Sequence, residues 1–165
     1  MTMQLRPVDF ADAAAIAELY GHYVRTHPAT FELDPPGATE IARRIEKVLR
    51  GGYPFWVACD DTRLLGYAYA SEYRERPAYN KTVENSVYVA HDAGKRGIGR
   101  ALMERVIDDC RKAGYREMIA VIGDSANAPS IALHTKLGFV HIGVFKNVGF
   151  KLGRWLDTVL MQRTL

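Results

Sequence analysis

This sequence of 165 residues has only two cysteines, no long apolar run and a small net charge. The two cysteines, Cys59 and Cys110, lie far apart on apolar stretches and form no CxxC pair, which argues against a disulfide and against a thiolate metal site. No apolar run is long enough to span a bilayer, and the N-terminus has no apolar signal segment. We therefore expect a soluble, cytoplasmic protein that does not enter a membrane.

A strongly basic or acidic region is also missing. The formal net charge is only +3, and acidic residues are spread along the whole chain, so no patch for nucleic acid is indicated. The histidines outside the helix at 127–138 have no metal-ligand spacing, and we expect no metal. With 48% hydrophobic residues and neither linker nor repeat, the composition predicts one domain over residues 1–165.

Hydrophobic periodicity and turn residues predict the order of the elements. A strand at 3–8 is followed by helices at 9–26 and 38–52, with Asp9 or Asp12 as the first cap. Three consecutive antiparallel strands are expected within 53–90. A helix at 97–113, a strand at 116–123, a helix at 127–138 and two strands joined around Asn147 to Gly149 complete the chain. The pattern indicates an α/β or α+β domain with a mixed sheet.

The stretch SVYVAHDAGKRGIGRAL (86–102) places three glycines between a strand and a helix. Such turns hold anions, because a helix N-terminus offers free N–H groups and a positive dipole end. A P-loop is excluded, since Arg100 and Ala101 follow Gly99 where Lys and Ser or Thr are required. A dinucleotide fingerprint needs Gly or Ala where Leu102 stands, although Asp124 after the next strand keeps that alternative open.

The same loop resembles that of the GCN5-related N-acetyltransferase superfamily, whose signature [QR]-x-x-G-x-[GA] follows a strand. Gly97-Ile98-Gly99 matches its core, and Gly94 departs from the usual Gln or Arg. The second motif of the superfamily is matched by NAPSIALHTKLGF (127–139), where His134 replaces the usual Tyr. The resemblance implies the fold of that superfamily, a mixed, mostly antiparallel central sheet flanked by helices.

The resemblance also implies acetyl-coenzyme A as co-substrate. The preceding strand would bind the pantetheine arm, the glycine loop would bind the pyrophosphate, and backbone N–H groups near Tyr88 would polarise the acetyl carbonyl. The residues that it assigns to the coenzyme are Val87, Tyr88, Val89, Lys95, Arg96, Gly97, Ile98, Gly99, Arg100, Asn127 and Ser130.

Two further stretches, YRERPAYNKTVENSVYV and VGFKLGRWLDTVLMQ, are similar to the phosphinothricin and L-amino-acid N-acetyltransferase branch. That branch transfers an acetyl group to the α-amino group of a small amino acid or an analogue such as methionine sulfone. The resemblance implies a homodimer, and we assign Trp155 and Asp157 to a structural role or to the dimer interface.

The chemistry requires a base, because an amine near pH 7 is mostly ammonium and is not nucleophilic. Glu84 is the candidate, since strand alternation places it on one face with Ser86 and Tyr88. For proton donation to the leaving thiolate, His134 stands where the superfamily often has Tyr. The alternative for His134 is a polar side chain on the exposed side of a short helix.

Substrate anions call for cationic partners, and Arg74 and Arg76 are the candidates. We place both on the end of a strand, where side chains two residues apart point the same way and can face one pocket. A solvated charged edge is the alternative. Phe31 and Tyr79 are pocket walls by resemblance only. Acetylation of peptide N-termini or polyamines, and a non-catalytic acyl-coenzyme A sensor, remain as other functions, although the arginine pair would repel polyamines.

Overall fold

The computed structural model describes residues 2–165 as a seven-stranded mixed sheet in the order β1-β2-β3-β4-β5-β7-β6. Only β4 and β5 are parallel; all other neighbouring strands are antiparallel. The strands are β1 (Gln4–Pro7), β2 (Phe55–Cys59), β3 (Leu64–Glu72), β4 (Thr82–Val89), β5 (Glu117–Gly123), β6 (Val140–Lys151) and β7 (Arg154–Thr164). The predicted mixed, mostly antiparallel sheet is confirmed.

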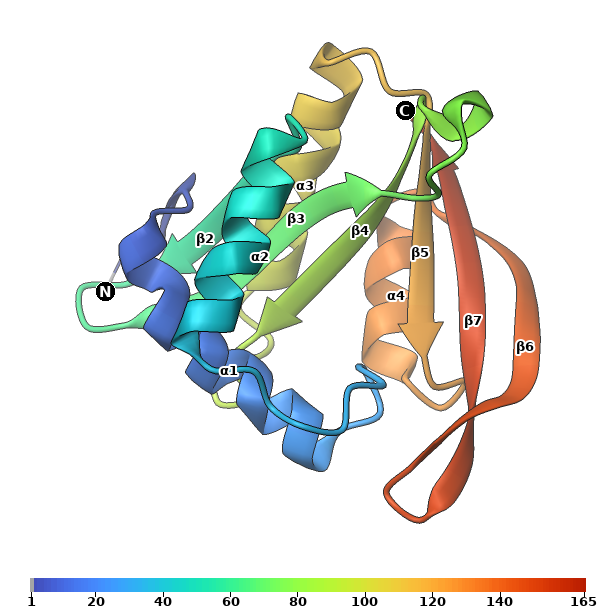
Figure 1. Cartoon of the computed structure of the whole chain (residues 1–165), viewed down its shortest axis with the longest axis horizontal. Coiled ribbons are helices and arrows are strands. Elements are labelled where there is room, and N and C mark those ends of the chain that lie inside the picture. Colours follow the sequence, from blue (N-terminus) through green and yellow to red (C-terminus); the bar gives the residue numbers. More distant parts are fainter. Residues whose placement is uncertain (1) are drawn as a thin grey trace.

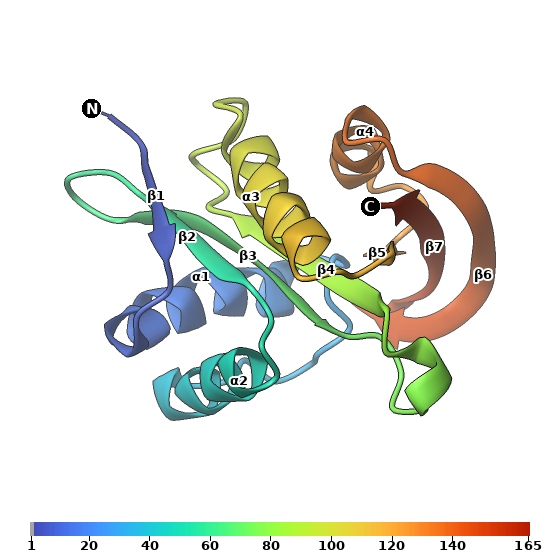
Figure 2. The same ribbon diagram turned by 90° about the horizontal axis from the view of Figure 1, so that it is seen from above.

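Within residues 2–165, four α-helices cover the two faces of this sheet. Figure 2 shows α1 (Ala13–Thr26) and α2 (Ala38–Arg50) on one face, with α3 (Ile98–Lys112) and α4 (Ala128–Lys136) on the other. A short 3-10 turn, η1 (Phe10–Asp12), precedes α1 and is capped by the Asp9 carboxylate. A second, η2 (Pro77–Tyr79), lies between β3 and β4. No helix in the described part of the chain is long and apolar enough to cross a membrane.

Each helical layer has its own core. The α3 layer buries Leu102, Met103 and Val106 against the central strands, and Cys110 lies among them as expected. The α1 and α2 layer buries Ile16 and Ile45 against β2 and β3, where it meets a cluster of tyrosine rings. The apolar stripe of each amphipathic helix therefore faces the sheet.

The two parallel strands diverge toward their C-terminal ends (Figure 1). Their pairing covers only Thr82–Glu84 against Glu117–Ile119. Beyond it, β4 stays with β3 and β5 stays with β7, so a gap opens inside the sheet. The helices α3 and α4 begin beside the open end of this gap, which places the glycine loop there.

The C-terminal hairpin corrects one prediction. The turn residues at Asn147 to Gly149 do not join the last two strands; β6 continues to Lys151, which pairs with Arg154. Asn147 instead has a left-handed φ of 53° in an irregularity between Phe145 and Gly149. The reversal falls at Leu152 and Gly153, with φ of 54° and 73°, so a bulge was mistaken for a turn.

Candidate active site

The gap between β4 and β5 forms a cavity of about 60 Å³ at the centre of the sheet. Ala90 N–H donates to Leu65 O, so β4 residues of even number bond to β3. The N–H groups of Val87 and Val89 consequently face the gap and flank Tyr88. The cavity is lined by Ala29, Asn85, Ser86, Val87, Tyr88, Ala120, Val121, Ile122, Gly123, Asn127, Ser130 and His134.

The glycine loop meets the open end of the gap with the free N-terminus of α3. Gly97 is the N-cap with φ of 73°, a left-handed conformation that side chains rarely adopt, and it provides no side-chain cap. No acidic residue lies in the first turn of α3. Lys95, Arg96 and Arg100 are exposed beside it, and Arg100 pairs with Glu104. The free backbone N–H groups, the positive end of the helix dipole and the basic side chains all suit an anion such as pyrophosphate.

A close approach at Gly99 completes this loop. A methyl group built there would lie 3.3 Å from Leu133 of α4 and 3.5 Å from Val89, so a side chain would fill the space between helix and strand. Gly94 differs, since a methyl group at this position meets nothing within 4 Å. The loop therefore tolerates a side chain where the superfamily has Gln or Arg. The residues present fit the pyrophosphate and pantetheine arm of a coenzyme.

His134 lines the gap and is only 2% exposed, so the alternative of a polar side chain on the exposed side of a short helix is excluded. Its Nδ1 lies 2.8 Å from the Ser130 carbonyl, and its Nε2 lies 3.0 Å from Asn85 Oδ1. Burial lowers the pKa of His134, while the Ser130 carbonyl opposes that shift. Both partners are acceptor oxygens, so the two hydrogen bonds form together only when the ring is doubly protonated, which is the charged form that burial opposes.

Asn85 was missed at the sequence level, although a signal was present. It alternates with Val83 and Val87 on an otherwise apolar face of β4, and it is 7% exposed. Its Nδ2 donates to Ile119 O across the closed end of the gap. A polar residue on the apolar face of a strand indicates a buried hydrogen-bond partner, which here is His134.

We predict that His134→Leu lowers the free energy of unfolding by about 1–3 kcal/mol, because Asn85 Oδ1 loses its buried partner. Urea denaturation measures the difference. His141→Leu is the matched control, since His141 is exposed on β6 and should leave stability unchanged. Equal stability of His134→Leu and the wild type would contradict the buried bond.

Glu84 lies on the opposite face of β4 from Asn85, together with Ser86 and Tyr88, as alternation predicted. Burial raises the pKa of Glu84 above its usual range. No salt bridge within residues 2–165 uses its carboxylate. A partly buried carboxylate without a cationic partner can accept a proton near neutral pH.

Arg74 and Arg76 do not stand on a strand end. The prediction that strand alternation points both side chains the same way therefore rests on a wrong position. The strand β3 ends at Glu72, and both arginines are exposed in the loop to β4, where Arg76 caps η2. The Arg74 guanidinium lies 5.2 Å from the Tyr73 ring and 5.9 Å from the Tyr79 ring. Loop geometry and stacking, rather than strand alternation, set the direction of Arg74.

Trp155 is 62% exposed, so it does not lie in the core of the subunit, and the assignment to an interface stays a prediction. Its ring meets Phe150 edge to face, 5.2 Å between centroids. Asp157 instead joins structural elements: it accepts a hydrogen bond from Asn147 N at 3.0 Å and another from Ser125 Oγ. Among residues 2–165 no group of three or more His, Cys, Asp or Glu could hold a metal ion.

The split parallel pair, the free helix terminus and a carboxylate that has no salt bridge among the described residues are the features of an acyl-coenzyme A-dependent transferase. The chain belongs to the GNAT acetyltransferases: the family model described as Acetyltransferase (GNAT) domain matches residues 5–160. Within the family it falls in the phosphinothricin and methionine sulfoximine branch. The predicted family, branch and fold are confirmed.

Three relatives support this placement. The phosphinothricin N-acetyltransferase of Alcaligenes faecalis is 52% identical over 98% of this chain and 82% of its own length. The L-methionine sulfoximine/L-methionine sulfone acetyltransferase of Salmonella typhimurium is 39% identical over 99% of this chain and 95% of its own. A phosphinothricin acetyltransferase from Sinorhizobium meliloti, solved with acetyl-coenzyme A, has a TM-score of 0.95 and 46% identity over 100% of this chain and 89% of that one.

Proposed function

We propose that this enzyme transfers an acetyl group from acetyl-coenzyme A to the α-amino group of phosphinothricin, methionine sulfoximine, methionine sulfone or a similar small amino acid. The observation that carries the proposal is the cavity between β4 and β5, with Glu84 on the adjoining face of β4. Relatives that share 52% and 39% of their residues act on such substrates.

The coenzyme would bind across both motifs. Its pyrophosphate fits the N-terminus of α3, and its pantetheine arm fits beside the N–H groups of Val87 and Val89. Asn127 and Ser130 line the α4 side of the cavity. When bound, acetyl-coenzyme A supplies the activated acyl group. The gap-facing N–H groups are suited to stabilise negative charge on the acetyl oxygen.

Glu84 is proposed as the base that removes a proton from the substrate ammonium, directly or through water. Its raised pKa supports this role, since burial moves the pKa of the Glu84 carboxyl upward, toward neutral pH. His134 is proposed as the proton donor to the leaving thiolate, a step that it would carry out as the imidazolium. The Ser130 carbonyl and Asn85 Oδ1 face its two ring nitrogens, so both accept a hydrogen bond from the imidazolium and fix the plane of the ring.

For the substrate anion we propose Arg74 and Arg76. Both guanidinium groups are exposed, and none of the salt bridges within residues 2–165 engages them. Guanidinium groups bind carboxylate and phosphinate oxygens with paired hydrogen bonds. Phe31, half-buried beside the cavity, and Tyr79, stacked near Arg74, are proposed as walls of the amino-acid site.

The test is coenzyme A thiol release from acetyl-coenzyme A with phosphinothricin, methionine sulfone, free amino acids, spermidine and a short peptide. Release with the anionic amino acids alone is expected. Release only with spermidine or the peptide would reject the substrate assignment while leaving the transferase in place. No release with any amine, despite bound coenzyme in calorimetry, would favour an acyl-coenzyme A sensor.

We also propose a homodimer formed through the edge strand β6. Seven large apolar side chains are between 49% and 62% exposed along β6, its turn and the start of β7. They are Val140, Ile142, Phe145, Val148, Phe150, Leu152 and Trp155. A second copy can bury the same patch on both subunits about a twofold axis. Free Cys59 and Cys110 suit a reducing cytoplasm, the location that we propose.

We predict that the wild type sediments with twice the 18.5 kDa chain mass and that Trp155→Glu sediments as a monomer. A carboxylate in the middle of a buried apolar interface would be desolvated without a partner. Leu33→Glu is the matched control, because Leu33 is equally exposed but lies in the segment between α1 and α2. A dimer that survives Trp155→Glu would place the interface elsewhere.

A further inference from the structure

The element GFK (149–151) of β6 belongs to the tail that characterises the branch, yet neither the coenzyme nor the base uses it. Alternation along this strand turns Val148 and Phe150 outward, with 54% and 57% of each side chain exposed. Gly149 and Lys151 face the other way. They meet residues 27–37, which connect α1 to α2 and are called the α1–α2 segment below.

Lys151 binds the backbone at the start of this segment. Its side chain is buried, and its Nζ donates to His27 O at 2.8 Å, Thr30 O at 2.6 Å and Tyr23 O at 3.4 Å. These three carbonyls can occupy all three ammonium protons. The cation also lies at the C-terminal end of α1, where the helix dipole favours positive charge. Lys151 therefore fixes the direction in which the chain leaves α1.

Gly149 leaves room for Phe31 of the same segment. A methyl group built at Gly149 would lie 2.4 Å from Phe31 Cε2, and one built at Gly123 would lie 2.8 Å from Phe31 Cε1. The ring thus lies between Gly123 at the end of β5 and Gly149 of β6, the two strands that flank β7 in the sheet. Gly123 ends β5 and lines the cavity, so this position sets the Phe31 ring at the edge of the acetyl site.

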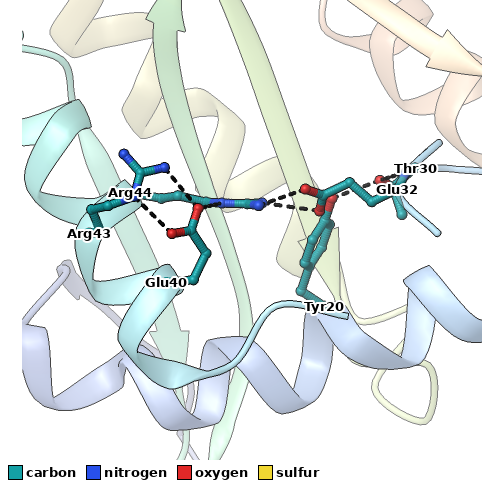
Figure 3. Close-up of polar contacts among 6 residues, drawn as sticks. All are labelled: Tyr20, Thr30, Glu32, Glu40, Arg43 and Arg44. Atoms are coloured by element: carbon teal, nitrogen blue, oxygen red, sulfur yellow. Dashed lines mark hydrogen bonds and ion pairs between the residues drawn. The ribbon is translucent and has the colours of Figure 1, made fainter. Parts of the chain in front are cut away.

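A network from α1 and α2 holds the far side of the segment (Figure 3). Arg44 of α2 binds the Glu32 carboxylate with Nη1 at 3.0 Å and Nη2 at 2.6 Å, and its Nε binds Glu40 at 2.9 Å. Tyr20 of α1 shares a hydrogen bond of 2.7 Å with the Thr30 hydroxyl. Residues 30–32 are consequently fixed from both sides, with Phe31 between the two attachments.

We propose that Gly149 and Lys151 are positioning residues for acetyl transfer. They hold the α1–α2 segment against β5, so that Ala29 closes the cavity between β4 and β5 and Phe31 forms one wall of the amino-acid site. This inference rests on the proposed function and adds to it the elements that give the pocket its shape. Neither residue touches the reacting atoms; both act through the segment.

The decisive variant is Gly149→Ala, which displaces the Phe31 ring and leaves Lys151 in place. We expect kcat/KM for the amino acid to fall about tenfold or more through a higher KM, because small displacements of a positioning group are costly. The KM for acetyl-coenzyme A should stay within about twofold. Gly143→Ala is the matched control on the same strand, since a methyl group there meets nothing within 4 Å.

A double-mutant cycle separates this mechanism from general damage to β6. If Gly149→Ala acts through the ring, it has no further effect in a Phe31→Ala background. Wild-type kinetics in Gly149→Ala, or the same loss in both backgrounds, would overturn the proposal.

Hydrogen exchange tests the attachment without any turnover. In Lys151→Met and in Gly149→Ala, amides of residues 27–37 should exchange faster, while those of α3 keep their rates. Lys146→Met is the control, because Lys146 is exposed on β6 and pairs only with Asp157. Unchanged exchange in both variants would reject the attachment. An inactive wild type with this exchange pattern would reject only the proposed function.

Discussion

Glu84→Gln is expected to lower turnover by about 10²–10⁴-fold, the usual contribution of a positioned general base. The substitution keeps the size of the side chain and removes only its ability to accept a proton. Acetyl-coenzyme A binding should persist, because the groups that we propose bind the coenzyme line the gap and the N-terminus of α3. Stopped-flow turnover and calorimetry with acetyl-coenzyme A measure the two effects separately. Loss of coenzyme binding together with turnover would indicate a structural role instead.

The pH dependence gives an independent reading of the same residue. Because burial raises the pKa of Glu84, kcat/KM of the wild type should fall as pH is lowered through that raised value. The folded state holds this proton more tightly than the unfolded state does. Glu84→Gln should therefore match the wild type in unfolding free energy at acid pH and exceed it at mildly alkaline pH. An unchanged acid limb in a Glu84→Gln enzyme that retains turnover would reject the assignment.

Gly97→Asp is expected to raise the KM for acetyl-coenzyme A by about a hundredfold, since two unfavourable effects combine. An L residue at a φ of 73° is strained, and a carboxylate at the helix N-terminus would repel the pyrophosphate. Steady-state kinetics with varied coenzyme at saturating amino acid measures this change, and the KM for the amino acid should change little.

Gly94→Ala is the control for Gly97→Asp. Gly94 lies in the same loop, its φ is not left-handed, and a methyl group there is free of contacts. We expect wild-type kinetics. If Gly97→Asp also left the coenzyme KM unchanged, the pyrophosphate would have to bind away from the N-terminus of α3.

Much of the fold could be predicted because the relevant signals are local. Helical spacing of Leu102, Val106 and Cys110 gave α3 almost to the residue, and alternation gave the face of β4 that carries Glu84. The C-terminal hairpin was misplaced for the same reason. Asn147 and Gly149 are turn residues by local rules, but the pairing of Lys151 with Arg154 extends β6 past them.

The parts of the site that could not be predicted depend on contacts between distant residues. Lys151 binds carbonyls that precede it by 121 and 124 positions, and no periodicity within the sequence carries that information. To place Arg74 correctly, the end of β3 has to be predicted to within two residues, and local sequence patterns do not give strand ends that accurately. His134 lay on a short helix whose buried side only the sheet defines.

The short ladder between β4 and β5 has a consequence for the response of the enzyme to its co-substrate. Three residue pairs make up the backbone pairing between these two strands, so a ligand lying in the gap would join the strand segments that separate beyond them. Binding and folding are then linked by mass action. A hundredfold excess of acetyl-coenzyme A over its Kd would add about 2.7 kcal/mol to the folded state. The stability of the folded enzyme would therefore rise with the concentration of its own acetyl donor.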